Sequence, residues 1–220
     1  MELPAYTFPM SLTSTGAVRE AAEIDRPALV TRARRLEYFT VAWNVLEAVV
    51  ALVSGVMAGS VALVGFGLDS VIETLSAGIL LWRLRSNDEQ RERTARKLVG
   101  VCFLLLAAYV GVESLRGLWE RAQPERSLPG ILLSIASVVT MPLLARAKRH
   151  VAAQISSRAL HADSRQADFC TYLSAILLVG LLLNALLGWW WADPVAALVM
   201  VPIIAREGVQ GVRGEACECG

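Results

Sequence analysis

The chain has 220 residues, 55% of them hydrophobic, with a mean hydropathy of +0.50 and a formal net charge of +1. Apolar residues gathered in long runs are typical of membrane proteins and not of a soluble core. The basic residues stand at the ends of these runs and form no recognition patch, so nucleic-acid binding is not expected. The composition therefore predicts an integral membrane protein.

Residues 1–36 are polar and contain three prolines, and we expect a loosely ordered tail with one short surface helix. The segment lacks an apolar run followed by a small-residue cleavage site, so no signal peptide is expected. Residues 37–211 are expected to form a transmembrane domain, and residues 212–220 a short cytoplasmic tail. We expect no soluble C-terminal domain.

Six apolar runs are candidates for membrane-spanning helices, which predicts an all-α six-helix bundle. They cover residues 39–60, 61–82, 98–119, 130–145, 167–187 and 193–205. The first two follow each other with almost no loop, so they are expected to form a tight antiparallel hairpin. The fourth is short, and Pro142 is expected to kink its end. Residues 146–165 are basic with scattered aliphatic residues, which predicts an amphipathic helix at the membrane surface. Gly188 is expected to turn the chain before the last span.

The distribution of Lys and Arg predicts the orientation of the spans. Of the 21 Lys and Arg residues, only Arg116, Arg121 and Arg126 fall on the side of the membrane opposite the two termini. Cytoplasmic loops of membrane proteins carry an excess of basic residues. Both termini are therefore expected to be cytoplasmic, in a multi-pass protein of the cell membrane (plasma or inner).

Two acids, Asp69 and Glu73, lie inside the second apolar run, in the stretch GFGLDSVIETLSAG. Their i, i+4 spacing places both carboxylates on one face of a helix. A charge in hydrocarbon is costly, and two like charges one turn apart are relieved by a cation or a shared proton. No Lys or Arg occurs in the middle of a predicted span. A cation site is therefore favoured over a salt bridge to an intramembrane arginine.

The fifth run opens with HADSRQADFCTYLSAILL, and as a helix it places Asp163, Gln166 and Cys170 on one face. Each can donate a lone pair to a metal, cysteine as the thiolate that a bound cation promotes. Alternatively, Asp163 only attracts cations at the cytoplasmic mouth, Gln166 bonds between helices and Cys170 packs. Asp168 lies off this face and is expected to contact solvent, an arginine or another helix. Mixed oxygen and sulfur ligands suit Zn2+ or Cd2+ better than Mg2+ or Ca2+.

Three segments together resemble the transmembrane domain of the cation diffusion facilitator family. They are GSVALVGFGLDSVIETLSAG at the junction of the first two spans, the opening of the fifth span, and ADPVAALVMVPIIAREG in the sixth. The resemblance covers about residues 39–211. It implies six spans with both ends inside, and a metal ion, usually zinc, that is exchanged for protons. The ion is held by two ligands at i, i+4 from each of spans two and five.

Asp69 and Glu73 match the span-two ligand pair of that family by position. An alignment on the shared Ala-Asp at Asp163 puts Gln166 and Cys170 where the family usually has His or Asp and then Asp. Because glutamine does not titrate, this site would have fewer proton-exchanging groups than usual. The family's cytosolic metal-binding domain, which helps to hold the dimer together, is not found in this chain. The implied homodimer would then rest on the spans and the surface helix.

The other polar residues of the spans have simpler interpretations. Glu47 and Glu113 are lone acids, for which pairing with a polar residue across the bundle is favoured over a proton-relay or access-path role. Asn184 is expected to bond between helices, and Asp193 before Pro194 to be the N-cap of the sixth span.

The four cysteines form no disulfide framework, and two of them, Cys217 and Cys219, lie at the end of the chain. In a cytosolic tail this pair stays reduced. It can be a soft-metal capture site, but a disordered end is favoured.

The leading hypothesis is a secondary transporter that exports a divalent cation, most simply zinc, in exchange for protons, with no other cofactor. The second is a metal-binding membrane partner that regulates another transporter without transporting itself. An intramembrane aspartyl hydrolase fits poorly, because its acids would have to lie on two facing spans beside a tight glycine motif. No Ser/His pairing lies in the spans and no phosphate-binding loop is found, so an enzyme is not expected.

Overall fold

The computed structural model describes residues 14–83 and 89–213, and its regular structure within them is entirely α-helical. These residues form α1 (Ser14–Ala58), α2 (Val61–Arg83), α3 (Glu89–Glu120), α4 (Leu128–Ile155), α5 (Arg158–Leu187) and α6 (Ala192–Arg213). All six contain a segment long and apolar enough to cross a membrane. The predicted all-α six-helix membrane bundle is thus confirmed for this part of the chain. Cys217 and Cys219 lie outside the described residues.

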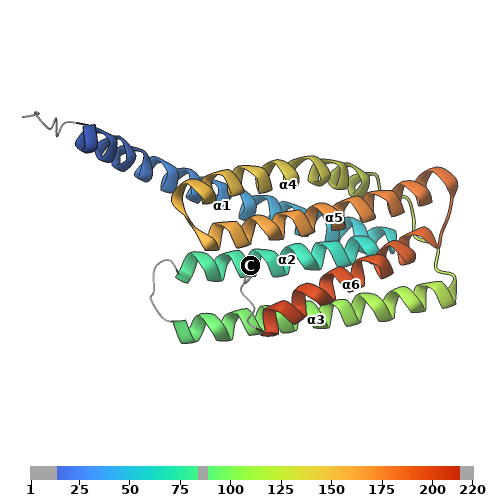
Figure 1. Cartoon of the computed structure of the whole chain (residues 1–220). Coiled ribbons are helices and arrows are strands. Elements are labelled where there is room, and N and C mark those ends of the chain that lie inside the picture. The colour runs from blue at the N-terminus through green and yellow to red at the C-terminus, as the bar shows by residue number, and fades with distance from the viewer. Residues whose placement is uncertain (1–13, 84–88, 214–220) are drawn as a thin grey trace, which may run out of the picture.

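The helices run side by side in one bundle, as Figure 1 shows. The most extensively packed pairs are α3 with α6, α4 with α5 and α1 with α2, and α1 also packs on α4. One end, here called the hairpin end, carries the α1–α2, α3–α4 and α5–α6 connections. The opposite end, the terminus end, carries the α4–α5 turn and the last residues of α6, and the start of α1 projects beyond it (Figure 1). The cytoplasmic location of the terminus end stays a prediction.

Large apolar side chains are exposed on the outer surface of the bundle, whereas many polar side chains are buried inside it. Exposed examples are Val53, Leu75, Leu105, Leu132, Leu186 and Val199, one from each helix. The core is largely apolar, as in a soluble protein, but here the outer, lipid-facing surface is apolar as well. Acids held inside the bundle therefore lie in a medium in which charge is costly.

The turn between α1 and α2 consists of Gly59 and Ser60, which confirms the predicted tight hairpin. Gly59 has a φ of 64°, in the left-handed region that glycine adopts without steric cost. The hydroxyl of Ser60 then accepts the backbone N–H of Leu63 at 3.1 Å, as the N-cap of a helix does. This turn determines how α2 lies against α1.

Asp193, which is far from this turn in the sequence, also forms hydrogen bonds with it. Its carboxylate accepts the backbone N–H of Val61 at 3.0 Å and of Ala62 at 3.4 Å, and also the hydroxyl of Ser60. The prediction that Asp193 is the N-cap of the sixth span is therefore wrong. Helix α6 already begins at Ala192, so Asp193 lies in its first turn and caps α2 instead.

Two predicted segments are replaced by longer helices. Within the predicted polar tail, α1 begins at Ser14 and runs without interruption into the first span, so a loosely ordered tail is wrong from residue 14 onward. The predicted surface helix over residues 146–165 is also wrong. Helix α4 continues past Pro142 to Ile155, and α5 begins at Arg158.

The break between α4 and α5 has a local cause in two serines. Ser156 adopts a left-handed conformation with a φ of 53° and ends α4. Ser157 is extended, and its hydroxyl accepts the backbone N–H of Leu160 at 3.3 Å, which starts α5. Residues 146–165 are thereby divided between two bundle helices.

Candidate cation site

Asp69 and Glu73 of α2 are buried inside the bundle, with only 3% and 7% of their surface exposed. They lie one turn apart on one helix, as their spacing predicts. Glu73 accepts a hydrogen bond from the side-chain amide of Asn44 at 3.0 Å. The Oδ2 atom of Asp69 is buried and has no hydrogen-bond partner. An unpaired buried carboxylate oxygen is rare in proteins and calls for an explanation.

Helix α1 contributes two further buried polar residues, Asn44 and Glu47, spaced i, i+3. Asn44 faces Glu73, and its own Oδ1 atom is buried without a partner. Because the side-chain NH2 group donates to the carboxylate, the amide oxygen is the atom left over. The first span therefore lines the acidic site, which the sequence analysis did not predict.

Glu47 is fully buried and joins four helices through hydrogen bonds. Its carboxylate accepts the indole N–H of Trp43 at 2.8 Å, the hydroxyls of Ser70 (3.4 Å) and Ser137, and the thiol of Cys170 at 3.8 Å. The expectation that Glu47 pairs with polar residues across the bundle is confirmed. This network holds a carboxylate on α1 next to the polar face of α2.

The buried acids act on one another electrostatically. Asp69 lies within electrostatic range of Glu47 and Glu207. Glu73 lies within electrostatic range of Asp69, Glu47, Asp163 and Glu207. The Oε2 atom of Glu207, near the terminus end of α6, is also buried without a hydrogen-bond partner. Like charges gathered in a low-dielectric interior are stabilised when a cation or protons enter among them.

The predicted span-five residues lie in two different surroundings. Cys170 is fully buried and contacts Glu47, and it lies within electrostatic range of Asp69 and Glu73. Gln166 lies one turn away on α5 and is partly buried. Asp163 is further toward the terminus end and is ion-paired. Of the three, Cys170 is the one that the structure brings next to the buried acids.

Lys148 of α4 is fully buried and forms an ion cluster with acids of two other helices. Its ammonium lies 3.4 Å from the carboxylate of Glu37 on α1 and is also paired with Asp163 on α5. The basic sequence around Lys148 predicts a surface helix. Because α4 continues into this region, the lysine is instead inside the bundle, and it already neutralises Asp163.

Two other acids lie near arginines, Asp168 as expected and Glu113 beside an arginine of its own helix and not across the bundle. Asp168 is paired with Arg149, which confirms the expected contact with an arginine. Glu113 is half-buried on α3 and interacts electrostatically with Arg116, which is itself paired with Glu120. Neither acid is part of the group around Asp69 and Glu73.

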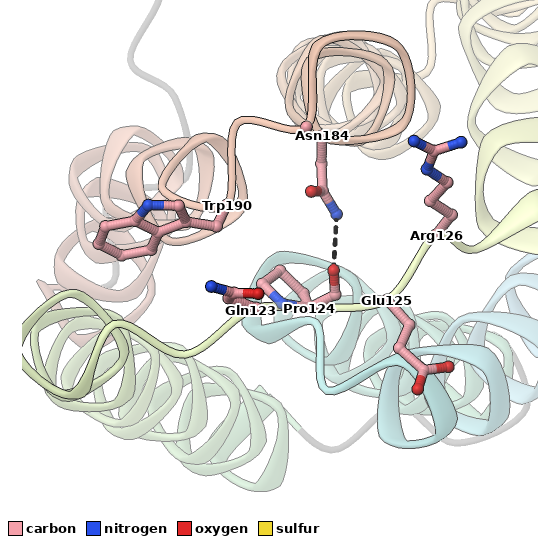
Figure 2. A pocket seen from close by; sticks show the side chains of 7 residues that line it. Gln123, Pro124, Glu125, Arg126, Asn184 and Trp190 are labelled. Atoms are coloured by element: carbon pink, nitrogen blue, oxygen red, sulfur yellow. Dashed lines mark hydrogen bonds between the residues drawn. The ribbon is translucent and has the colours of Figure 1, made fainter.

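A pocket of about 570 Å³ opens at the hairpin end of the bundle, as Figure 2 shows. It is lined by residues 123–126 of the α3–α4 connection and by Asn184, Gly188 and Trp190. The side-chain amide of Asn184 donates to the carbonyl oxygen of Pro124 at 2.9 Å, so it tethers a connection and not a neighbouring helix (Figure 2). None of the buried acids lines this pocket.

Among the described residues, no three His, Cys, Asp or Glu side chains are grouped so that they could hold a metal ion. The ligand set Asp69, Glu73, Gln166, Cys170 and Asp163 therefore stays a prediction. The signal that the sequence analysis missed is the i, i+3 pair of Asn44 and Glu47 in the first span. It lies opposite the acids of α2, because α1 and α2 form a hairpin.

Comparisons with known proteins match the part of the chain that forms the helical bundle. The sequence pattern of the cation efflux transmembrane domain matches residues 38–213. Transmembrane protein 163 of Xenopus laevis is 28% identical over 186 residues, which cover 80% of this chain and 64% of that protein. The cation-efflux pump FieF of Shewanella oneidensis is 32% identical over 111 residues, which cover 50% of this chain and 35% of the pump. The matches thus span less than two thirds of either relative.

Proposed function

Since this chain belongs to the cation efflux family, we propose that it is a secondary transporter that moves a divalent cation out of the cytoplasm. Zinc is the proposed cation, and protons are the proposed counter-ions. Support for cation transport comes from the matched family domain and from the likeness to a cation-efflux pump. The whole relatives are longer than the matched regions, so the activity proposed for this chain rests on its own residues.

The observation that carries the proposal is the buried pair Asp69 and Glu73 at mid-depth in the bundle. Two carboxylates, one with an unpaired oxygen, lie in a membrane interior beside a third at Glu47. Intramembrane acids that are not neutralised by a neighbouring lysine or arginine are typical of ion and proton pathways. In this structure the buried Lys148 is paired with Glu37 and Asp163 instead.

In the proposed mechanism a cation and protons compete for the same carboxylates. The cation enters from the terminus end, past Asp163 and Glu207, and displaces protons from Asp69 and Glu73. The bundle then changes from inward to outward access. Protons from the other side replace the cation and restore the neutral site. Cys170, adjacent to Glu47, is the proposed sulfur ligand and favours zinc or cadmium over hard cations.

We also propose the wider setting of this activity. The transport domain is residues 37–211, with 1–36 and 212–220 outside it. The protein functions as a homodimer in a cell membrane, with both termini in the cytoplasm. It has no enzymatic activity and needs no cofactor besides the cation that it carries.

A second candidate function is a metal-binding partner that regulates another transporter. Two observations favour it: Gln166 cannot exchange a proton, and Asp163 is already neutralised by Lys148. This candidate predicts that the purified protein binds metal without moving it across a membrane.

The test is metal uptake into proteoliposomes that contain only this protein, with zinc, cadmium, cobalt and manganese compared across an imposed pH gradient. Gradient-dependent uptake that disappears in Asp69→Ala supports the transporter and ranks its metals. Asn184→Ala is the matched control, because it removes a buried polar side chain far from the acids. Uptake that persists in both Asp69→Ala and Glu73→Ala rejects the proposed site, and binding without uptake favours the regulatory partner.

A further inference from the structure

Asn44 occupies an unusual position for an amide in a membrane helix. It is 1% exposed, and its NH2 group donates to Glu73 at 3.0 Å. Its oxygen is buried and accepts no hydrogen bond. An amide oxygen that is taken out of water and left unpaired costs free energy, so a position that keeps one needs a reason beyond packing.

The orientation of this amide follows from its partner. The NH2 group of Asn44 faces Glu73 and donates to its carboxylate, as it would to the ionised acid that holds a cation. The amide oxygen, which is bonded to the same carbon as that nitrogen, is then the free atom. A neutral oxygen of this kind is a ligand that divalent cations accept in proteins.

A second unpaired oxygen belongs to the same site. Asp69, one turn from Glu73 on α2, has a buried Oδ2 atom without a partner. The two unpaired oxygens, of Asn44 and Asp69, thus come from the facing helices α1 and α2. The Gly59–Ser60 turn connects these two helices. Both side chains are more than nine-tenths buried, so solvent at the protein surface does not satisfy them.

We propose that Asn44 supplies a neutral oxygen ligand from α1 to the cation held by Asp69 and Glu73. The inference rests on the proposed function and adds a determinant that the span-two and span-five ligand pairs do not include. The NH2 group of Asn44 keeps Glu73 in place, while its oxygen completes the oxygen ligands around the cation. Asn44 therefore adjusts the metal preference of the site as well as its affinity.

The expected consequence is a change in selectivity when the amide oxygen is removed. Manganese prefers oxygen ligands, whereas zinc and cadmium also bind well to a sulfur ligand such as Cys170. Without the Asn44 oxygen, the remaining site is relatively richer in sulfur. Affinity for manganese should fall further than affinity for zinc and cadmium. A merely structural role would lower all three by a similar factor.

The experiment is calorimetric titration of the purified full chain in lipid nanodiscs with Zn2+, Cd2+ and Mn2+. Asn44→Ala should weaken manganese binding by roughly 10- to 100-fold, and zinc and cadmium binding by clearly less. Asn44→Asp should recover much of the manganese affinity, because it restores an oxygen at the same place. An ionised aspartate cannot donate to Glu73, so a structural role of the NH2 group would not be rescued.

Controls separate this inference from the proposed function. Asn184→Ala should bind all three metals like the wild type, and Asp69→Ala should bind none. If Asn44→Ala matches Asn184→Ala, or if it lowers all three affinities equally with no rescue by Asn44→Asp, the inference is overturned while the proposed function stands. If the wild-type protein binds none of the metals, the proposed function fails and the inference with it. Monodisperse elution and an unchanged helical spectrum confirm that each variant is folded.

Discussion

The carboxylate of Asp193, in the first turn of α6, caps α2 by accepting the backbone N–H of Val61 at 3.0 Å. The first N–H groups of a helix lack partners within the helix, and a negative charge near them is stabilising. This contact fixes the hairpin end of the helix that carries both candidate ligand acids. Helices α2 and α6 are thereby joined at one end of the bundle.

Asp193→Ala should therefore destabilise the protein. It leaves the N–H groups of Val61 and Ala62 buried without an acceptor, which costs about 1–3 kcal/mol. The measurement is the free energy of unfolding in a detergent titration. Asp168→Ala is the matched control, because its ion pair with Arg149 is about one third exposed, and its loss should cost less than about 1 kcal/mol. Equal losses in the two variants would contradict the capping role.

Lys148→Met should be among the most damaging single substitutions in the bundle. It leaves Glu37 and Asp163 as buried acids without their shared cation, and such a change costs about 3–5 kcal/mol. Adding Glu37→Gln to this variant should recover part of the loss. Arg116→Met is the control, because the Arg116–Glu120 pair is exposed on α3. Thermal unfolding of the purified proteins checks this order of stability. A Lys148→Met protein as stable as the control would refute the ion cluster.

Cys170→Ser should change which metals the protein binds. The substitution replaces a sulfur by an oxygen of similar shape, so cadmium affinity should fall roughly tenfold while manganese affinity is retained. Titrations of the three metals with the variant give the ratio. Cys102→Ser, at an exposed position on α3, is the control and should bind like the wild type. Unchanged cadmium affinity in Cys170→Ser would remove the sulfur from the proposed ligand set.

The contact between α3 and α6 should not tolerate a side chain at Gly208. A Cβ atom there would lie 2.8 Å from the Cγ of Leu104 and 2.9 Å from the carbonyl oxygen of Gly100. Gly208→Ala should therefore cost about 1–3 kcal/mol through overpacking. At Gly111 on α3 the nearest atom would be 3.8 Å away, so Gly111→Ala should change stability by less than about 1 kcal/mol. Unfolding titrations of both variants test this difference in stability. The difference should vanish if α3 and α6 pack less closely than in this structure.

The features that the sequence predicts correctly depend on local pattern. Six apolar runs give six helices, and the i, i+4 spacing of Asp69 and Glu73 is enough to place both acids on one face. The tight turn before α2 follows from the absence of a loop between two spans. In each case the deciding residues are neighbours along the chain.

The features that the sequence analysis missed depend on residues far apart in the chain. Glu37 and Lys148 are separated by 111 positions, and Ser60 and Asp193 by 133. The local sequence around Lys148 is basic, which predicts a surface helix. Its burial follows from where α4 ends and from the acids that two other helices bring to it. A role for Asn44 in the site could not be predicted, because a single amide in an apolar run does not show which residue faces it. The facing residue, Glu73, is known only from the structure.

The most direct test of the central claim records zinc entry and proton exit together in vesicles that contain the wild-type protein or Asp69→Asn. The variant keeps the size of the side chain but cannot exchange a proton or offer a charged oxygen. The proposed mechanism predicts that zinc entry drives protons out of the wild-type vesicles, and that both movements are lost together in Asp69→Asn. Zinc entry without proton movement, or an Asp69→Asn protein that still exchanges zinc for protons, would contradict it.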